Sequence, residues 1–146
     1  MTELEPLSPE LIRRYLDADG AAYDVDEDGD FVFEYDPDPD SGCTLTVYLS
    51  ITERDWYSIV IANERTFQRA DWERLVWLCN TWNAEEMYPM AYLLADPATP
   101  DEADIFLDHT YIAKFGISQE QLQHLTEEII DSAFAFWDWA HSEHRV

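Results

Sequence analysis

The chain has 146 residues and a formal net charge of −24, from 32 acidic and 8 basic side chains. A field of that sign repels phosphate backbones and anionic lipid heads, so nucleic acid and membrane surfaces are excluded as favourable partners. The length fits one domain over residues 1–146 with one proper core, and an aromatic content of 14% predicts that large rings fill it.

The start of the chain and its cysteines are typical of a cytoplasmic protein. The opening M-T-E-L-E-P-L-S lacks the basic and apolar regions of a signal peptide. No apolar run approaches the roughly 18 residues that read as a membrane span. Cys43 and Cys79 lie inside apolar patterns, where free cysteines behave as small buried hydrophobes. We therefore expect a cytoplasmic location and no framework of disulfides.

The first predicted helix begins at Pro9 and ends near Gly20. Ser8 suits the N-cap, proline suits the first turn, and Glu10 complements the helix dipole. Glycine favours a stop at the other end. The apolar stripe consists of Leu11, Ile12, Tyr15 and Leu16.

The next segment, Asp24–Asp30, reads D-V-D-E-D-G-D and has two interpretations. Its aspartates fall at positions 1, 3 and 5 of a calcium loop, with Gly29 at position 6. Position 12, where that loop needs a bidentate glutamate, is Tyr35. A D-G turn ahead of a strand explains the same residues. A hairpin turn and a weak cation site both stay open.

Alternating or continuous apolar runs predict five strands, three of them joined by short polar turns as an antiparallel meander. They are expected at Phe31–Asp36, Thr44–Ile51, Trp56–Asn63, Tyr88–Ala95 and Ile105–Ala113. The acidic, proline-containing stretch Asp96–Asp104 is predicted to be a loop.

A helix is predicted from about Gln68 to Ala84, and it leads directly into the fourth strand. Its apolar residues recur with the 3.6-residue period of one helix face. They are Trp72, Leu75, Val76, Cys79 and Trp82. We expect this helix to lie across the sheet.

Asn80 and Asn83 are the most pointed polar residues of this helix. An asparagine near a helix C-terminus can cap it, and its amide can bond the start of the following strand. A ligand-binding role for Asn80 and Asn83 is the alternative.

The last helix begins with the capping box Ser118-Gln119-Glu120-Gln121. Its inner stripe is predicted to be Leu122, Leu125, Ile129, Ala133, Phe136 and Ala140. Further apolar residues widen this surface: Ile130, Phe134, Trp137 and Trp139. A second binding partner and two-sided packing within the chain both explain the excess. Under the first explanation Trp137, Trp139 and Phe134 are candidate partner-binding residues, because tryptophan is enriched at binding hot spots.

Three patterns carry a resemblance to a known family. They are the acidic turn Asp28-Gly29-Asp30, the break Gly116-Ile117-Ser118, and the central L-C-N-T-W-N (78–83) followed by Y-P-M-A-Y (88–92). With them the chain resembles the bacterial YbjN-like family, whose members are named as sensory transduction regulators. The family is similar in fold to type III secretion chaperones, which are small, acidic, usually dimeric proteins that hold an unfolded partner segment. The resemblance implies a homodimer formed through the central or the final helix. The acidic stretch Asp96–Asp104 departs from the family's pattern.

No catalytic signature occurs in the sequence. The four glycines form no phosphate-binding loop, and no G-x-S-x-G motif is present. We expect no enzyme activity, no catalytic or metal-binding residues and no cofactor.

We predict an α+β domain in the order α-β-β-β-α-β-β-α, with a five-stranded, mainly antiparallel sheet packed with three helices. The predicted function is a non-catalytic protein-binding, chaperone-like or regulatory module whose sheet edge or helix surface takes a protein segment. The alternative is a sensor for a small ligand or a cation, using Asp24–Asp30 or a pocket beside Asn83.

Overall fold

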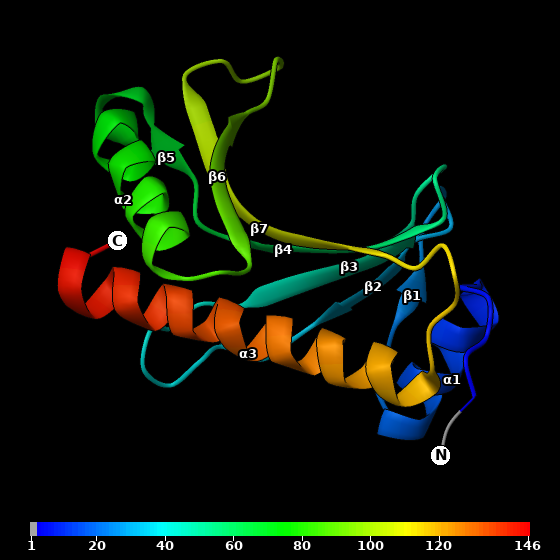
Figure 1. The fold of residues 1–146 in the computed structure, drawn as a ribbon. Helices are drawn as coiled ribbons and strands as arrows, with labels where there is room; N and C mark the ends of the chain where they lie inside the picture. The colour runs from blue at the N-terminus through cyan, green and yellow to red at the C-terminus, as the bar shows by residue number, and fades with distance from the viewer. Residues whose placement is uncertain (1–2) are drawn as a thin grey trace.

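The structure is a computed structural model that describes residues 3–146 (Figure 1). The helices are α1 (Pro9–Asp19), α2 (Trp72–Glu85) and α3 (Gln119–His144), with a 3₁₀ turn at Arg69–Asp71. The strands are β1 (Asp24–Val25), β2 (Phe31–Glu34), β3 (Leu45–Ile51), β4 (Trp56–Asn63), β5 (Phe67–Gln68), β6 (Met90–Ala95) and β7 (Glu102–Ile112). The predicted α+β class and the order of the main elements are confirmed.

The strands form one antiparallel sheet in which β7 has partners of different lengths on its two sides. The path runs β1-β2-β3-β4-β7, and β5 and β6 also pair with β7. The residues of β5 pair with Ala103 and Glu102, at the start of β7, while the second half of β7 pairs with β4. The sheet has seven strands because β1 and β5 join the five that the sequence predicted.

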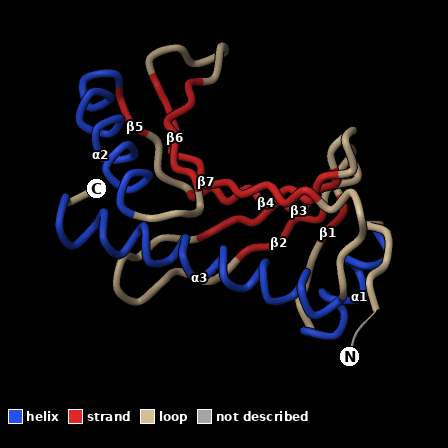
Figure 2. Tube along the Cα trace, viewed as in Figure 1, coloured by secondary structure: helices blue, strands red, loops and turns tan. Residues whose placement is uncertain are grey.

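The helices cover one face of the sheet. Along β3 and β4 the buried residues alternate with half-exposed ones, as expected for a sheet with one covered face. Figure 1 shows α3 running beneath the sheet, with α1 at one end of it and α2 beside β6 at the other. The tube view shows the same arrangement (Figure 2). The opposite face of the sheet therefore has no helix over it in the described part of the chain.

The helix ends follow the local signals in the sequence. The Ser8 hydroxyl accepts a hydrogen bond from the Leu11 N–H at 3.2 Å, and Gly20 ends α1 with a φ of 71°. In α3 the capping box is complete, because Ser118 and Gln121 each accept a bond from the other's backbone N–H, at 3.1 and 3.0 Å. No helix among residues 3–146 is both long enough and apolar enough to cross a membrane.

The central helix differs from its prediction at its start and on one face. Gln68 belongs to β5, and α2 begins at Trp72 after the 3₁₀ turn. Val76 is 46% exposed, so its predicted place on the buried face is wrong, and Leu78 lies there instead. The buried face packs on β6, and α2 leads into that strand, as the sequence predicted.

Candidate protein-binding edge

Strand β7 continues past the end of β6 and leaves part of its edge unpaired. The residues of β6 pair with 103–108 of β7, whereas those of β4 pair with 107–112 on the other side. Residues 109–112 therefore have a strand neighbour on one side only. In Figure 1, β6 begins at the bend of the sheet, and β7 extends beyond this point toward the start of α3.

The Asn83 side chain shows which backbone groups face this open side. It bonds both the N–H and the C=O of Ala91, at 2.8 and 2.9 Å, so these two groups of β6 point away from β7. In an antiparallel ladder the two backbone groups of a residue share one direction, which alternates along the strand. Because Ala91 lies opposite Leu107, the N–H and C=O of Asp108 point to β6. Two and four residues on, those of Thr110 and Ile112 point the same way, beyond the end of β6.

No residue among 3–146 bonds the backbone groups of Thr110 or Ile112 on this side. Two large apolar side chains of this region are also exposed to solvent: Ile112 is 61% exposed, and Phe115, just after the strand, is 88% exposed. Natural sheets usually protect such edges with lysine, proline or inward-pointing charge. Residues 109–119 contain no Asp or Glu, although the chain has 32 of them. This edge is therefore an apolar, weakly charged strip on a strongly acidic protein.

A groove of about 400 Å³ lies between α3 and the helix-facing side of β7, where His109 and Tyr111 of the 109–112 segment form part of its wall. It is lined by Tyr88, His109, Tyr111, Ile117, Gln121, His124, Leu125 and Glu128. The Tyr88 ring meets the His109 ring with a centroid separation of 5.7 Å, and the Tyr88 hydroxyl donates to Glu128 Oε1 at 3.3 Å. The groove thus combines aromatic and aliphatic walls with a few polar groups, the usual lining of a binding site.

The histidine in the groove is held in its neutral form. Burial lowers the pKa of His109, and the neighbouring Asp108 carboxylate opposes this shift only in part. Burial also raises the pKa of Asp108. The Asp108 side chain points to the opposite face of the sheet, since successive strand residues alternate. The two are therefore not arranged as an acid–base pair, and His109 offers the groove an uncharged ring.

Trp137 does not reach the surface, so the prediction that it is an exposed anchor is wrong. Its exposure is 0%, and the Arg65 guanidinium lies 5.9 Å from its ring centroid. The same guanidinium bonds the carbonyl of Ser41 in the β2–β3 loop and that of Val146 at the chain end. These contacts bring Arg65, the β2–β3 loop and the chain end together beside the buried tryptophan. Trp137 therefore packs inside its own chain, which favours two-sided packing as the explanation of the wide apolar surface of α3.

Trp139 and Phe134 are half-buried and packed against neighbours in the same chain. The Trp139 ring lies 5.7 Å from Trp82 and 4.7 Å from His144, between ring centroids. Phe134 meets the Tyr35 ring edge-on at 5.5 Å. Neither is the fully exposed anchor that the sequence suggested, although Trp139 lines a groove of about 490 Å³ between the ends of α2 and α3.

The Asn83 amide bonds the strand that follows the helix, as predicted, whereas the Asn80 side chain does not. Both bonding groups of the Asn83 amide are used by Ala91, so the side chain stands in for a neighbouring strand at the edge of β6. The indole N–H of Trp82 adds a bond to the Pro89 carbonyl at 2.9 Å, next to this contact. Asn80 is exposed and makes no hydrogen bond with another described residue through its side chain.

The acidic segment Asp24–Asp30 forms the hairpin that joins β1 to β2. Asp26 Oδ1 accepts the backbone N–H groups of Asp28 and Asp30 at 3.0 and 2.9 Å. Three carboxylates, of Asp26, Asp28 and Asp30, come within 4.8 Å of one another. The turn accounts for these residues, because the Asp26 carboxylate closes the loop that Gly29 allows with a φ of 84°. The weak cation site stays a prediction.

The free edge was not found in the sequence. The sequence predicts Leu125 as part of the inner stripe of the last helix and gives no binding role to Tyr88, Tyr111, His124 or Glu128, because each is an ordinary residue of its own element. One signal was available: an acid-free stretch at 109–119 in a strongly acidic chain. The relative lengths of β6 and β7, which create the edge, depend on pairing between distant segments.

One comparison with known proteins identifies a family, and a second finds a similar fold. The model of the YbjN family, described as "Putative bacterial sensory transduction regulator", matches residues 8–142. The chain is similar in structure to "YbjN, a putative transcription regulator from E. coli", with a TM-score of 0.74 over 97% of each chain and 11% identity. At that identity the likeness concerns the fold alone. No curated protein matches the chain.

Proposed function

Because the chain belongs to the YbjN family, whose matched region covers residues 8–142, we propose that it is a non-catalytic regulatory domain that binds a protein segment. The segment adds as a strand to the free edge of β7. The proposal is supported by the backbone groups of Thr110 and Ile112, which point to the β6 side of β7 at positions beyond the reach of β6.

In strand addition at this edge, the backbone groups of β7 supply affinity and the groove beside α3 supplies selectivity. The backbone groups of Thr110 and Ile112 bond to the main chain of the incoming segment, whatever its sequence. Alternate side chains of that segment then point into the groove against α3, whose walls include Tyr88, Tyr111 and Leu125. An extended segment with apolar residues at every second position fits both features. Holding such an unfolded segment is also the activity expected from the resemblance to secretion chaperones.

The test uses a proline at position 110, because it removes the free donor and no backbone donor of the ladder to β4. The ladder to β4 runs through His109 and Tyr111, whose backbone groups point the other way. Proline is tolerated on an edge strand where its missing N–H faced solvent. The matched control is Thr110→Val, which removes the hydroxyl and keeps the N–H.

We expect Thr110→Pro to keep the native circular dichroism spectrum and to lose a partner that the wild type retains from extracts of its native host. Thr110→Val should retain that partner, quantified by mass spectrometry. A folded Thr110→Pro variant that captures the same partner equally well would refute strand addition at this edge. If the proline variant is unfolded, Thr110 N-methylated by chemical ligation provides the same test.

The homodimer is a separate proposal, through α2 or α3. On α2, Trp77 is 58% exposed and lies next to the exposed Val76. This apolar surface supports pairing of two copies on the helix side, which leaves the β7 edge free. Sedimentation equilibrium of the purified protein should give the mass of two chains, and a monomer mass at micromolar concentration would contradict it.

A further inference from the structure

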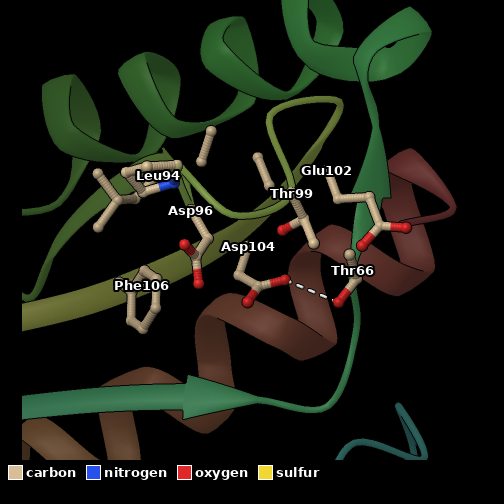
Figure 3. Close-up of a pocket in the computed structure, with 10 residues that line it drawn as sticks. Thr66, Leu94, Asp96, Thr99, Glu102, Asp104 and Phe106 are labelled. Atoms are coloured by element: carbon tan, nitrogen blue, oxygen red, sulfur yellow. Dashed lines mark hydrogen bonds between the residues drawn. The ribbon is translucent and has the colours of Figure 1, made fainter.

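A second cleft lies on the other side of the molecule from the β7 groove, where β6 and β7 meet their connecting loop. Its volume is about 510 Å³. Figure 3 shows Asp96 and Asp104 with their carboxylates side by side, the Phe106 ring at one end and Thr66 and Glu102 at the other. The remaining walls are formed by Leu94, Ala95, Pro97, Thr99 and Ala103.

The apolar part of this cleft is an aromatic wall. Phe106 stacks on Tyr92, with 5.9 Å between ring centroids and 24° between planes, so its position is fixed by the neighbouring strand. Leu94 is 55% exposed beside it. Both side chains lie on the face of the sheet that no helix of residues 3–146 covers. A flat ring and an aliphatic side chain suit the hydrocarbon part of a ligand.

The polar part of the cleft is negative and held in place. Asp104 Oδ1 accepts a bond from the Thr66 hydroxyl at 2.8 Å, and Asp96 Oδ1 accepts the Ala98 N–H at 2.8 Å. The described chain forms two ion pairs, Arg14–Glu5 and Arg69–Asp101, and neither uses a carboxylate of this cleft. Glu102 and Asp104 are half-buried with their charges uncompensated.

The spacing of the carboxylates favours an extended cation over a metal ion. A metal needs several oxygen atoms close to one centre. Among residues 3–146 there are two clusters of three aspartates whose carboxylate oxygens lie within 4.8 Å of one another. The carboxylates of this cleft belong to neither cluster. An alkylammonium ion could instead place its ammonium group against the carboxylates while its alkyl chain packs on Phe106 and Leu94.

We propose that this cleft binds an alkylammonium group, that is, a primary amine carried on an aliphatic stem. Two sources share this chemistry: a free alkyl diamine and a lysine side chain of a protein. The proposal does not depend on strand addition at β7, because the two sites use different residues.

The first measurement is a calorimetric titration of the full chain with pentylammonium chloride at 150 mM salt, where general attraction to the acidic surface is screened to within about 8 Å. We expect saturable binding and no saturable heat from 1-pentanol, which has the same stem without charge. Binding of ammonium chloride as tight as that of pentylammonium, or equal binding of pentanol, would overturn the proposal.

Variants then place the site. Asp104→Asn and Phe106→Ser should each weaken the affinity for pentylammonium at least fivefold. The control Glu53→Gln removes one charge from the exposed β3–β4 turn and should change the affinity less than twofold. Equal weakening by Glu53→Gln and Asp104→Asn would show attraction to the acidic surface as a whole. A Phe106→Ser variant that fails to fold leaves the decision to Asp104→Asn and Asp96→Asn.

A final comparison distinguishes the two sources. Tighter binding of 1,5-diaminopentane than of a lysine capped at both ends indicates a free diamine, and the reverse order indicates a protein lysine. If neither binds more tightly than ammonium, the cleft is not an alkylammonium site.

Discussion

Two aspartates from distant parts of the chain meet at the end of α3. Asp138 lies within 4.8 Å of Asp38 and Asp40 of the β2–β3 loop, measured between carboxylate oxygens. Burial, with the hydrogen bond and charge of Asp38, raises the pKa of Asp138 from 3.8 to about 6, and His141 opposes this only weakly. The Ser41 N–H holds the pKa of Asp38 below its ordinary value. Below about pH 6 the proton of this pair therefore lies on Asp138 rather than on Asp38.

This arrangement predicts how one residue changes stability with pH. A carboxyl whose pKa rises on folding contributes stability that is fully present below its unfolded pKa of 3.8 and is lost as the pH rises through about 6. The asparagine of Asp138→Asn cannot ionise, so residue 138 should lose no stabilising contribution as the pH rises from 3.8 to about 6. The free energy of unfolding in urea should therefore favour the variant increasingly from pH 4 to pH 7.

The control is Asp131→Asn, an exposed site on the same helix. The advantage of Asp138→Asn over the wild type should grow from pH 4 to pH 7 more than that of this control. An Asp138→Asn variant that is less stable than the wild type at pH 7 would contradict the shared proton.

At the scale of elements, one side chain joins α2 to the strand that follows it. Asn83→Ala would leave the N–H and C=O of Ala91 without their partner at the edge of β6. Loss of these two bonds should lower the free energy of unfolding by about 1–3 kcal/mol. Asn80→Ala, at an exposed position of the same helix, should change it by only about 0.5 kcal/mol. Equal effects of the two substitutions in urea unfolding would contradict this role of Asn83.

Elements defined by local signals were predicted from the sequence, and those defined by distant pairing were not. The bounds of β4, the caps of α1 and the capping box of α3 follow from neighbouring residues. Strands β1 and β5 have two residues each and exist because of their partners. The start of β7 at Glu102 lies inside the predicted acidic loop, because pairing with β5 and β6 outweighs the low strand propensity of its acids.

At the candidate site, too, features set by neighbouring residues could be predicted, and features set by distant contacts could not. Asn83 could be assigned from its place near the end of a helix, ahead of an apolar strand. The buried position of Trp137 could not, because it depends on Arg65 and on the carbonyl groups of Ser41 and Val146. The free edge of β7 depends on where β6 begins relative to β7, which is a matter of pairing between distant segments.

At the scale of the whole molecule, the net charge of −24 works against the compact state. The two ion pairs of residues 3–146 are both exposed and compensate little of it. Screening shortens the range of repulsion from about 30 Å at 0.01 M salt to about 8 Å at 0.15 M. The melting temperature should therefore rise over this range, equally with sodium chloride and with tetramethylammonium chloride. A flat response would contradict strain from self-repulsion.

Strand β7 has an unpaired edge at residues 109–112, and amide hydrogen exchange of the free protein, followed by NMR, measures this at each backbone N–H group. The N–H groups of His109 and Tyr111 bond to β4 and should exchange slowly. Those of Thr110 and Ile112 should exchange at close to the rates of an unstructured peptide. Slow exchange at all four positions would show that this edge is already covered and would contradict strand addition at β7.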